Sequence, residues 1–218
     1  MLRRQFLAMA AAAAIGTVAS MPAMALTEGT DYVVLENPVP NAENTVIKVF
    51  SYDCPFCFKY AQAVDKAVLD QVPEMQFTPF HLKTKGKYGI QGSQLLAVAL
   101  VKDEAAGLKP LDPNSNFHKV EMGLYNAYHV KKERWDDGAD AFIDTGLKAA
   151  GWDRAQFDKD VQDPKVQALI ERWEVSYPIA KIQGVPAYVV NGKYLLKTAR
   201  ITSLDGMAAS IRELSAKK

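Results

Sequence analysis

A run of β-branched and aromatic residues leads directly into two closely spaced cysteines and then into an amphipathic helix. Residues 45–52 (Thr-Val-Ile-Lys-Val-Phe-Ser-Tyr) have the composition of a buried strand. Cys-Pro-Phe-Cys follows at 54–57, and apolar residues then recur at helical spacing until Pro73. Residues 75–82 again have the character of a strand. This order predicts two parallel strands joined by a right-handed crossover, which restricts the chain to α/β folds.

The segment between Gly86 and Pro178 has helical periodicity throughout. The expected helices, separated by glycines and prolines, are 93–106, 116–135, 139–150, 154–162 and 165–177. Strand character returns at 185–190, and Asn191-Gly192 predicts a tight turn into a second strand at 194–197. A last helix is expected after Ser203, which is a suitable N-cap. We therefore predict an α/β domain of residues 26–85 and 178–218, interrupted by an all-helical subdomain of residues 86–177.

The N-terminus has the pattern of a signal peptide. Arg3 and Arg4 precede an apolar run at 6–18, and Ala-Met-Ala at 23–25 is a small-x-small cleavage site, so we expect cleavage after Ala25. The apolar run is too short to span a bilayer. The paired arginines also resemble a twin-arginine signal, and both export routes stay open. Either route delivers the protein to a compartment where disulfides form.

Composition and charge narrow the function classes. The chain has 218 residues, of which 49% are hydrophobic and 23% charged, as in a soluble globular protein. Its formal net charge is +1, and it becomes −1 once the two arginines of residues 1–25 are removed. This balance gives no support to nucleic-acid binding, which requires a clustered basic surface.

Cys54 and Cys57 are the only cysteines in the sequence, and their position favours reactivity. A disulfide that closes so small a ring would stabilise the fold by only about 2 kcal/mol. Pro55 suits the first position of a helix, which makes Cys54 the N-cap. The free amides and the helix dipole there favour a Cys54 thiolate, and stabilising that reduced form makes the disulfide more oxidising. We expect Cys54 to be the exposed nucleophile and Cys57 the resolving thiol.

A metal site is the main competing use of the two cysteines. Zinc needs about four ligands, and this motif supplies two. Only His81, His118 and His129 could add nitrogen ligands, and their spacing matches no zinc-binding pair. We therefore expect no metal and no organic cofactor. An inert pair of buried cysteines is a further alternative, which the proline at the helix start disfavours.

A second informative motif is Gly-Val-Pro at 184–186, directly before the predicted strand. A proline at a strand entry has either a cis peptide bond or an ordinary trans bond at a sheet edge.

These motifs together resemble the DsbA family of thiol:disulfide oxidoreductases. The resemblance covers nearly the whole mature chain, and residues 47–58 and 181–194 are most similar to the DsbL branch. It implies a thioredoxin fold, a cis Val185–Pro186 bond facing the disulfide, and a monomeric periplasmic dithiol oxidase that passes its Cys54–Cys57 disulfide to exported proteins. It further implies re-oxidation by a DsbB-like, quinone-linked membrane protein, called DsbI for this branch, and a dedicated client, an arylsulfate sulfotransferase.

The sequence departs from the common family pattern at two positions that tune the thiol. Phe56 stands where the usual motif has histidine, so it brings no imidazolium to the Cys54 thiolate. Lys48 stands where common members carry an acid. If Lys48 lies beneath the disulfide, its ammonium favours the thiolate; the alternative is a lysine that extends to solvent. Asp53 acts in the opposite direction, because a neighbouring carboxylate raises a thiol pKa.

Some side chains have two interpretations. Three lysines after the second strand are either a basic rim for acidic clients or a solvated loop, namely Lys83, Lys85 and Lys87. Four aromatic residues of the insertion are expected to pack between helices, namely Phe117, Tyr125, Tyr128 and Trp135. Two other functions also stay open. The first is a reductase or isomerase of the same fold, and the second is a metal-binding or chaperone module.

Overall fold

The computed structural model describes residues 25–217 and contains a five-stranded sheet in the order β1-β5-β4-β2-β3. The strands are β1 (Tyr32–Val34), β2 (Thr45–Phe50), β3 (Gln76–His81), β4 (Ala187–Val190) and β5 (Tyr194–Leu196). The pair β2/β3 is parallel and the other neighbours are antiparallel, which confirms the predicted parallel pair and the predicted hairpin. Strand β1 was not predicted, since three residues are too few for a periodic signal. Apart from Ala25, the predicted signal peptide lies outside the described residues.

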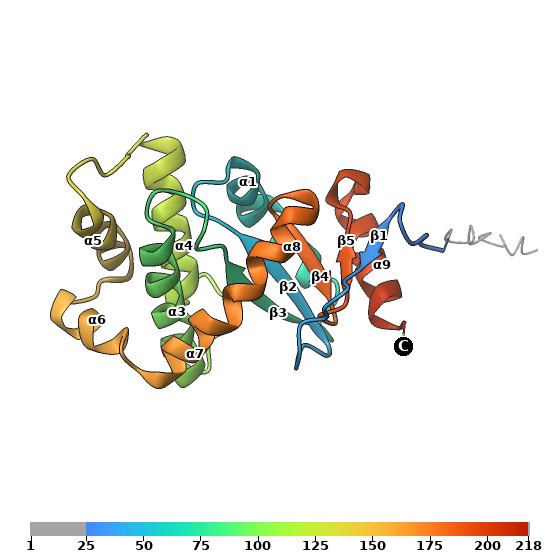
Figure 1. Cartoon of the computed structure of the whole chain (residues 1–218), viewed down its shortest axis with the longest axis horizontal. Helices are drawn as coiled ribbons and strands as arrows, with labels where there is room; N and C mark the ends of the chain where they lie inside the picture. Colours follow the sequence, from blue (N-terminus) through green and yellow to red (C-terminus); the bar gives the residue numbers. More distant parts are fainter. Residues whose placement is uncertain (1–24, 218) are drawn as a thin grey trace, which may run out of the picture.

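Helices surround the sheet and gather at one end of the molecule (Figure 1). Next to the sheet are α1 (Pro55–Ala63), α2 (Asp65–Leu69), α8 (Ser176–Gln183), the short 3-10 turn η3 (Thr198–Arg200) and α9 (Leu204–Ser215). Between β3 and α8 the chain forms α3 (Gly89–Ala106), α4 (Asn116–Tyr125), η1 (Asn126–Val130), α5 (Ala139–Ala150), α6 (Arg154–Asp160), α7 (Pro164–Arg172) and η2 (Trp173–Val175). This arrangement agrees with an inserted helical subdomain, and its boundaries at residues 86 and 177 stay a prediction.

Several helix ends differ from the predictions, each for a local reason. The helix expected to run until Pro73 is interrupted at Val64 and ends at Leu69. The helix expected to continue to Trp135 ends after the π-helical turn η1, and Lys132 and Trp135 then have positive φ angles of 61° and 53°. Pro178 does not end the helical region, because it lies in the first turn of α8, where its missing N–H costs no hydrogen bond.

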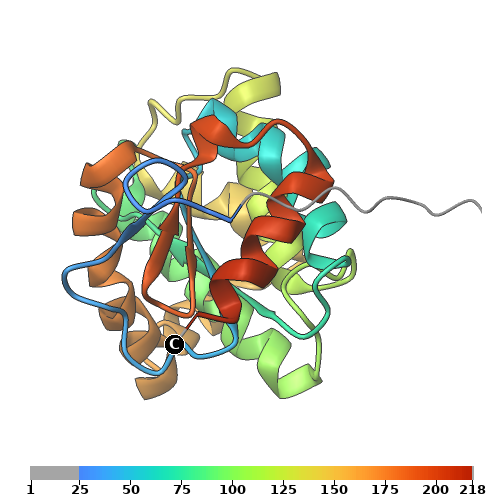
Figure 2. The ribbon, with the colours of Figure 1, turned by 90° about the vertical axis from the view of Figure 1, so that its right-hand side faces the viewer.

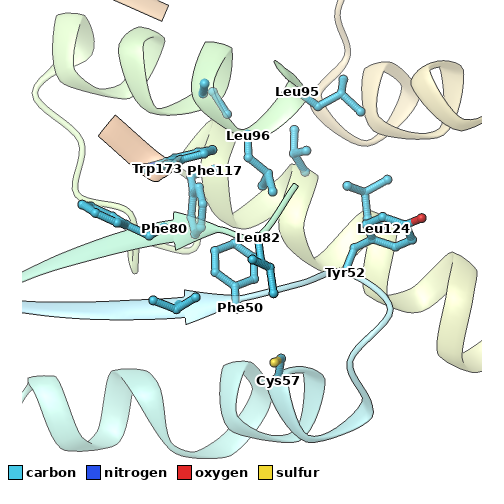
Figure 3. Packing of buried hydrophobic residues seen from close by; sticks show 14 of the residues in the cluster. Phe50, Tyr52, Cys57, Phe80, Leu82, Leu95, Leu96, Phe117, Leu124 and Trp173 are labelled. Carbon is cyan, nitrogen blue, oxygen red and sulfur yellow. The ribbon is translucent and has the colours of Figure 1, made fainter. Parts of the chain in front are cut away.

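Two hydrophobic clusters pack on the sheet. The larger cluster lies where the sheet meets the inserted helices and includes Phe50, Phe80, Leu96, Phe117 and Trp173 (Figure 3). The second lies between the sheet and the helices α2 and α9; Figure 2 shows α9 in front of the sheet in that view. The second cluster includes Val46, Val68, Tyr188, Met207 and Ile211. The sheet is therefore covered on both faces, which fixes the position of β2 and of the loop that follows it.

The four aromatic residues expected to pack between helices do so. Phe117, Tyr125 and Trp135 are buried, and Tyr128 is half-buried with its ring centroid 6.1 Å from that of Trp135. Trp135 also contacts Tyr52, at a centroid distance of 5.9 Å, just before the cysteines. The insertion thus packs directly on the loop that carries the cysteines. Within residues 25–217, every helix falls short of the length and apolarity that crossing a bilayer would require.

Candidate active site

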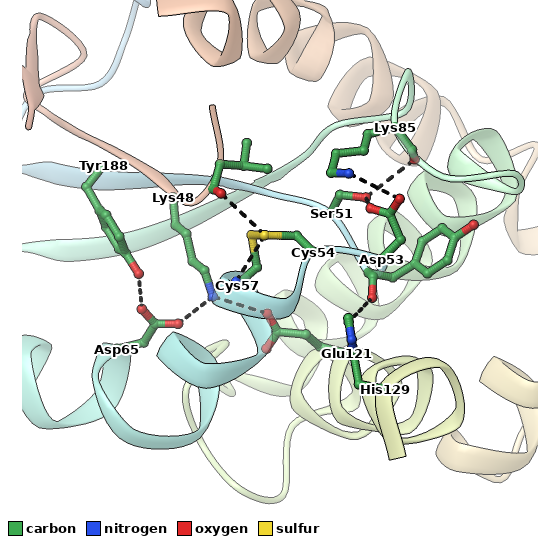
Figure 4. Close-up of a disulfide and its surroundings, with 12 residues drawn as sticks. Lys48, Ser51, Asp53, Cys54, Cys57, Asp65, Lys85, Glu121, His129 and Tyr188 are labelled. Atoms are coloured by element: carbon green, nitrogen blue, oxygen red, sulfur yellow. Dashed lines mark hydrogen bonds and ion pairs between the residues drawn. A yellow bond between two sulfur atoms is a disulfide. The ribbon is translucent and has the colours of Figure 1, made fainter. Parts of the chain in front are cut away.

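Cys54 and Cys57 form a disulfide at the start of α1, with their Cα atoms 5.2 Å apart (Figure 4). Cys54 is the N-cap, Pro55 occupies the first helical turn, and the backbone N–H of Cys57 donates a hydrogen bond of 3.1 Å to Cys54 Sγ. The predicted N-cap position is confirmed. A sulfur held there faces the positive end of the helix dipole, which favours a negative charge on Cys54.

The two sulfurs differ little in exposure. Cys57 is 0% exposed and Cys54 3% exposed, so the expectation of an openly exposed Cys54 is wrong. The reason is the loop before β4: the carbonyl oxygen of Val185 lies 3.3 Å from Cys54 Sγ and covers it. The Val185–Pro186 peptide bond is cis, as the family resemblance implies. The side chain of Phe56 is 61% exposed.

Lys48 lies in a buried cluster of charged residues below the disulfide in the view of Figure 4. Its side chain is 0% exposed, and its Nζ lies 2.5 Å from Asp65 Oδ2 on α2 and 3.5 Å from Glu121 Oε1 on α4. The hydroxyl of Tyr188, on β4, donates to the other oxygen of Asp65. The alternative of a lysine that extends to solvent is therefore wrong.

The charges in this cluster oppose the effect of burial. Burial alone would lower the pKa of Lys48, but the negative charges of Asp65 and Glu121 outweigh it and raise that pKa, so the ammonium stays charged. Burial also raises the pKa of Glu121 to about 7; Lys48 lowers it and Asp65 raises it further. Glu121 is therefore partly protonated near neutral pH.

Asp53, next to the nucleophile position, has two partners. Ser51 Oγ donates to Asp53 Oδ1 at 2.8 Å, and Lys85 Nζ lies 3.2 Å from Asp53 Oδ2. The side chain of Asp53 is 13% exposed. The Lys85 ammonium thus offsets part of the negative charge that Asp53 would otherwise exert on Cys54.

Comparisons with known proteins place this site in a family. A family model described as "DSBA-like thioredoxin domain" matches residues 112–209. The chain is 57% identical to the thiol:disulfide interchange protein DsbL of Escherichia coli O6:H1 over 201 residues, 91% of this chain and 90% of the relative. The chain belongs to the DsbA family. The predicted membership is therefore confirmed.

Other members of the DsbA family extend the comparison. The crystal structure of DsbL from Salmonella enterica serovar Typhimurium has a TM-score of 0.87 and 57% identity, covering 90% of this chain and 100% of that chain. DsbA of Yersinia pestis is 29% identical over 88% of this chain and 83% of the relative. The thioredoxin fold with inserted helices is thus confirmed. The protein is a thiol:disulfide oxidoreductase with a redox-active disulfide.

The usual DsbA motif has a histidine where this chain has Phe56. In this chain His129 contacts the loop before Cys54 and not Cys54 itself. His129, on η1, lies with Nε2 3.0 Å from the carbonyl oxygen of Tyr52, and its ring stacks on Phe58 at 5.3 Å. Burial lowers the pKa of His129, with the Tyr52 carbonyl opposing this shift. His129 therefore supports the loop before Cys54 as a largely neutral ring.

Each of the three loop lysines that could form a basic rim lies beside an acidic residue. Lys83 pairs with Glu174, Lys85 with Asp53, and Lys87 Nζ lies 3.9 Å from Asp136. The paired charges favour the interpretation of an ordinary solvated loop. Among the residues that the structure describes, no group of three or more His, Cys, Asp or Glu side chains is arranged to hold a metal ion.

Sequence reasoning missed Asp65 and Glu121. A signal for Glu121 is present, because it occupies an apolar position of α4, among Phe117, Val120, Leu124 and Tyr125 at helical spacing. A charged residue on such a stripe has to find a buried partner. The partner of Glu121 is the ammonium of Lys48.

Proposed function

We propose that this protein is a periplasmic dithiol oxidase that donates the Cys54–Cys57 disulfide to exported proteins with free thiols. The observation that carries the proposal is the position of Cys54 Sγ at the N-cap, where it accepts the Cys57 N–H. This position stabilises Cys54 as a thiolate and so makes it a good leaving group at the end of the reaction.

The reaction proceeds in two exchange steps. A client thiolate attacks Cys54 Sγ, the Cys54–Cys57 bond breaks, and Cys57 departs with the electron pair and takes up a proton. A second client thiolate then attacks the client sulfur of the mixed disulfide and releases Cys54 as a thiolate. The client loses two electrons and gains a disulfide, and the enzyme becomes a dithiol.

Val185 and Pro186 are proposed to form the client-binding edge. The Val185 carbonyl lies 3.3 Å from Cys54 Sγ, and the segment leads directly into β4. An extended client backbone that pairs with Val185 in the manner of an added strand would bring its cysteine sulfur to Cys54. Phe56, which is 61% exposed next to Cys54, would contribute an apolar surface to the same client.

The family relationship supports a proposal about partners and location. The DsbL and DsbA relatives are named thiol:disulfide interchange proteins. For this chain we propose a periplasmic location, with export directed by residues 1–25, action on exported substrates, re-oxidation by a DsbB-like quinone-linked membrane protein of the DsbI type, and an arylsulfate sulfotransferase as a dedicated client. No metal or organic cofactor takes part in the proposed exchange.

Cys57→Ala, expressed in the native cell, tests the assigned roles. The variant is expected to accumulate mixed disulfides at Cys54, since the resolving thiol is missing, and mass spectrometry would identify the clients and the re-oxidising partner. The matched control is Cys54→Ala, which should trap far fewer partners, because Cys57 lacks the N-cap position that stabilises a thiolate at Cys54. Equal trapping by both variants would contradict the role of Cys54.

The direction of the reaction needs a separate measurement. Equilibration of the purified protein with graded glutathione should leave it reduced under conditions that keep thioredoxin-like proteins oxidised. A thioredoxin-like, reducing equilibrium would instead support a reductase.

A further inference from the structure

The first residues of the described chain contact the last helix. The backbone nitrogen of Leu26 donates a hydrogen bond of 2.7 Å to Oε1 of Glu213, on α9, across a sequence separation of 187. The Leu26 side chain packs on the second hydrophobic cluster, whereas Ala25 is exposed. In Figures 1 and 2 the start of the described chain lies beside α9, at the end of the molecule away from the inserted helices.

A turn fixes the position of Leu26 along the chain. The N–H of Asp31 donates to the carbonyl oxygen of Thr27 at 2.8 Å, and the N–H of Thr27 donates to Asp31 Oδ2 at 2.9 Å. The N–H of Gly29 donates at 2.8 Å to the carbonyl oxygen of Tyr32, the first residue of β1. Because β1 is paired with β5, this turn holds the Leu26 nitrogen in one register relative to the sheet.

The same nitrogen is the one that the predicted removal of the signal peptide would free. The Ala-Met-Ala pattern at 23–25 predicts cleavage after Ala25. Hydrolysis of the Ala25–Leu26 bond by a signal peptidase consumes one water molecule and leaves a carboxylate on Ala25 and an amine on Leu26. The amine binds a proton near neutral pH and becomes an ammonium. The neutral hydrogen bond to Glu213 then becomes an ion pair.

The charged groups around this contact leave the Glu213 carboxylate available to the new ammonium. Lys217, one turn later on α9, has its Nζ 3.9 Å from Glu213 Oε1, and the two side chains are 32% and 33% exposed. The Leu26 nitrogen, at 2.7 Å, is closer to the same oxygen. Asp31, the acid of the turn, has its own cation, because Arg200 Nε lies 3.8 Å from Asp31 Oδ1.

We infer that Glu213 is the docking site for the N-terminus that signal-peptide cleavage creates. The Leu26 ammonium and the Glu213 carboxylate join the N-terminal segment to α9 by a charge-assisted hydrogen bond, which is stronger than the neutral bond of the uncleaved chain. Cleavage one residue earlier or later would move the ammonium by about 3.8 Å along the chain, away from the carboxylate. This inference rests on the export part of the proposed function and is independent of the exchange reaction.

A zero-length cross-link tests the geometry. The protein that starts at Leu26, prepared by removal of an N-terminal fusion, is treated with a carbodiimide, which joins an amine to a carboxylate in contact with it and releases one water. Peptide mass mapping should find the α-nitrogen of Leu26 joined to Glu213. Lys217→Arg removes the competing amine beside Glu213 and should leave this product in place. Absence of the product in both proteins would overturn the inference.

Urea unfolding tests the contribution of the charge. The comparison form keeps Ala-Met-Ala at 23–25, so that its Leu26 nitrogen is a neutral amide. The unfolding equilibrium constant should be about fivefold smaller for the form that starts at Leu26, because a hydrogen bond to a charged group contributes more than a neutral one. In Glu213→Gln the two forms should differ by less than about twofold.

Glu104→Gln is the matched control for this comparison. It makes the same change at an exposed position of α3, and the two forms should keep their full difference. Equal stability of the two forms in the wild type would overturn the inference, and so would an equal difference in the wild type and in Glu213→Gln.

The pH dependence separates the charge from the three added residues. The ammonium of Leu26 loses its proton as the pH rises above about 8, so the difference between the two forms should be full at about pH 6.5 and nearly absent at about pH 10. A difference that does not change with pH would overturn the inference. The other ionisable groups beside the contact are present in both forms, so their titration cancels, namely Asp31, Tyr32, Lys197, Arg200 and Lys217.

The intact mass of the protein exported in the native cell tests the link to cleavage. The mass should correspond to a chain that begins at Leu26. An exported protein with a different N-terminus would overturn the inference and leave the proposed location intact. A protein that begins at Leu26 and gives the cross-link but donates no disulfide would instead contradict the proposed dithiol oxidase.

Discussion

Lysines lie beside carboxylates in two regions of this protein, and the two regions differ in their access to water. Lys48 is 0% exposed beneath α1, where it contacts Asp65 and Glu121. The loop between β3 and α3 places Lys83, Lys85 and Lys87 beside acids as well, but their side chains are 38%, 40% and 60% exposed. The same pair of chemical groups is thus present in two very different dielectric environments.

The difference decides what each pair does. Exposed ion pairs contribute about 0–1 kcal/mol, because water and salt screen them and the long side chains lose entropy. A buried pair costs much more to break than it contributes, since either partner left alone is an uncompensated buried charge. The loop pairs therefore contribute little to stability, whereas the Lys48 cluster is costly to break.

Lys48→Met should have the largest effect, because it removes the cation that contacts both buried acids. The change leaves the Asp65 carboxylate buried without a cation, and we expect it to lower the free energy of unfolding by about 3–5 kcal/mol in urea titrations. It should also raise the pKa of Cys54, measured by thiolate absorbance, because the net charge of the cluster becomes more negative.

Two further variants control for the loss of the lysine itself. Lys87→Met makes the same chemical change on the exposed loop and should leave the urea midpoint unchanged. Lys48→Met combined with Asp65→Asn should recover part of the lost stability, because the uncompensated charge is removed as well. A loss below about 1 kcal/mol in Lys48→Met would show that the buried cluster behaves as a surface pair does.

The features of the site that depend on neighbouring residues were predictable. The N-cap position of Cys54 follows from Pro55 and the start of the helical pattern, and the structure has it. The parallel pair β2/β3 and the hairpin at Asn191-Gly192 follow from local patterns in the same way. The cis bond at Val185–Pro186 came from the family resemblance, because the residues alone left cis and trans open.

The features that depend on tertiary contacts were not predictable. Lys48 interrupts an apolar run in β2, and the residues around it in the sequence do not identify the partners that keep it charged in the interior. Asp65 and Glu121 come from α2 and α4, and only the packing of the helical insertion on α1 brings them together. The shielding of Cys54 by Val185 likewise depends on how β4 is placed beside β2.

His81 is also a buried titratable residue, but its hydrogen-bond partner is the uncharged Ser93. Its Nδ1 lies 2.8 Å from Ser93 Oγ, and burial lowers its pKa from 6.5 to about 3. The folded protein therefore keeps His81 neutral, whereas the unfolded chain binds a proton below about pH 6.5. Stability from this source is full above pH 6.5 and is lost as the pH falls toward 3.

In His81→Gln the unfolded chain no longer binds this proton. The free energy of unfolding should therefore depend less on pH in the acid range. Between pH 6 and pH 4, the free energy of unfolding of the variant should fall less steeply than that of the wild type, by about 1.4 kcal/mol per pH unit. Burial also lowers the pKa of His118, which is half-buried, so His118→Gln should change the slope much less. Equal slopes in the wild type and His81→Gln would mean that His81 is protonated within the fold.

The smallest effect is expected at Lys85, the loop lysine that faces the active site. Lys85→Ala removes the ammonium 3.2 Å from Asp53, so the full charge of that carboxylate acts on the adjacent Cys54. We expect the thiolate fraction of Cys54 near its pKa to fall about twofold, because a charge at 40% exposure is strongly screened. Unfolding in urea should change by less than about 1 kcal/mol.

Lys87→Ala distinguishes this local effect from the overall charge of the loop. Both variants remove one positive charge from the same segment, but Lys87 pairs with Asp136, away from the cysteines in sequence and at the longer distance of 3.9 Å. The thiolate titration of Cys54 should therefore shift in Lys85→Ala and stay unchanged in Lys87→Ala. If both variants shift it equally, the loop acts on Cys54 as a diffuse basic surface, and the pairing of Lys85 with Asp53 has no specific role.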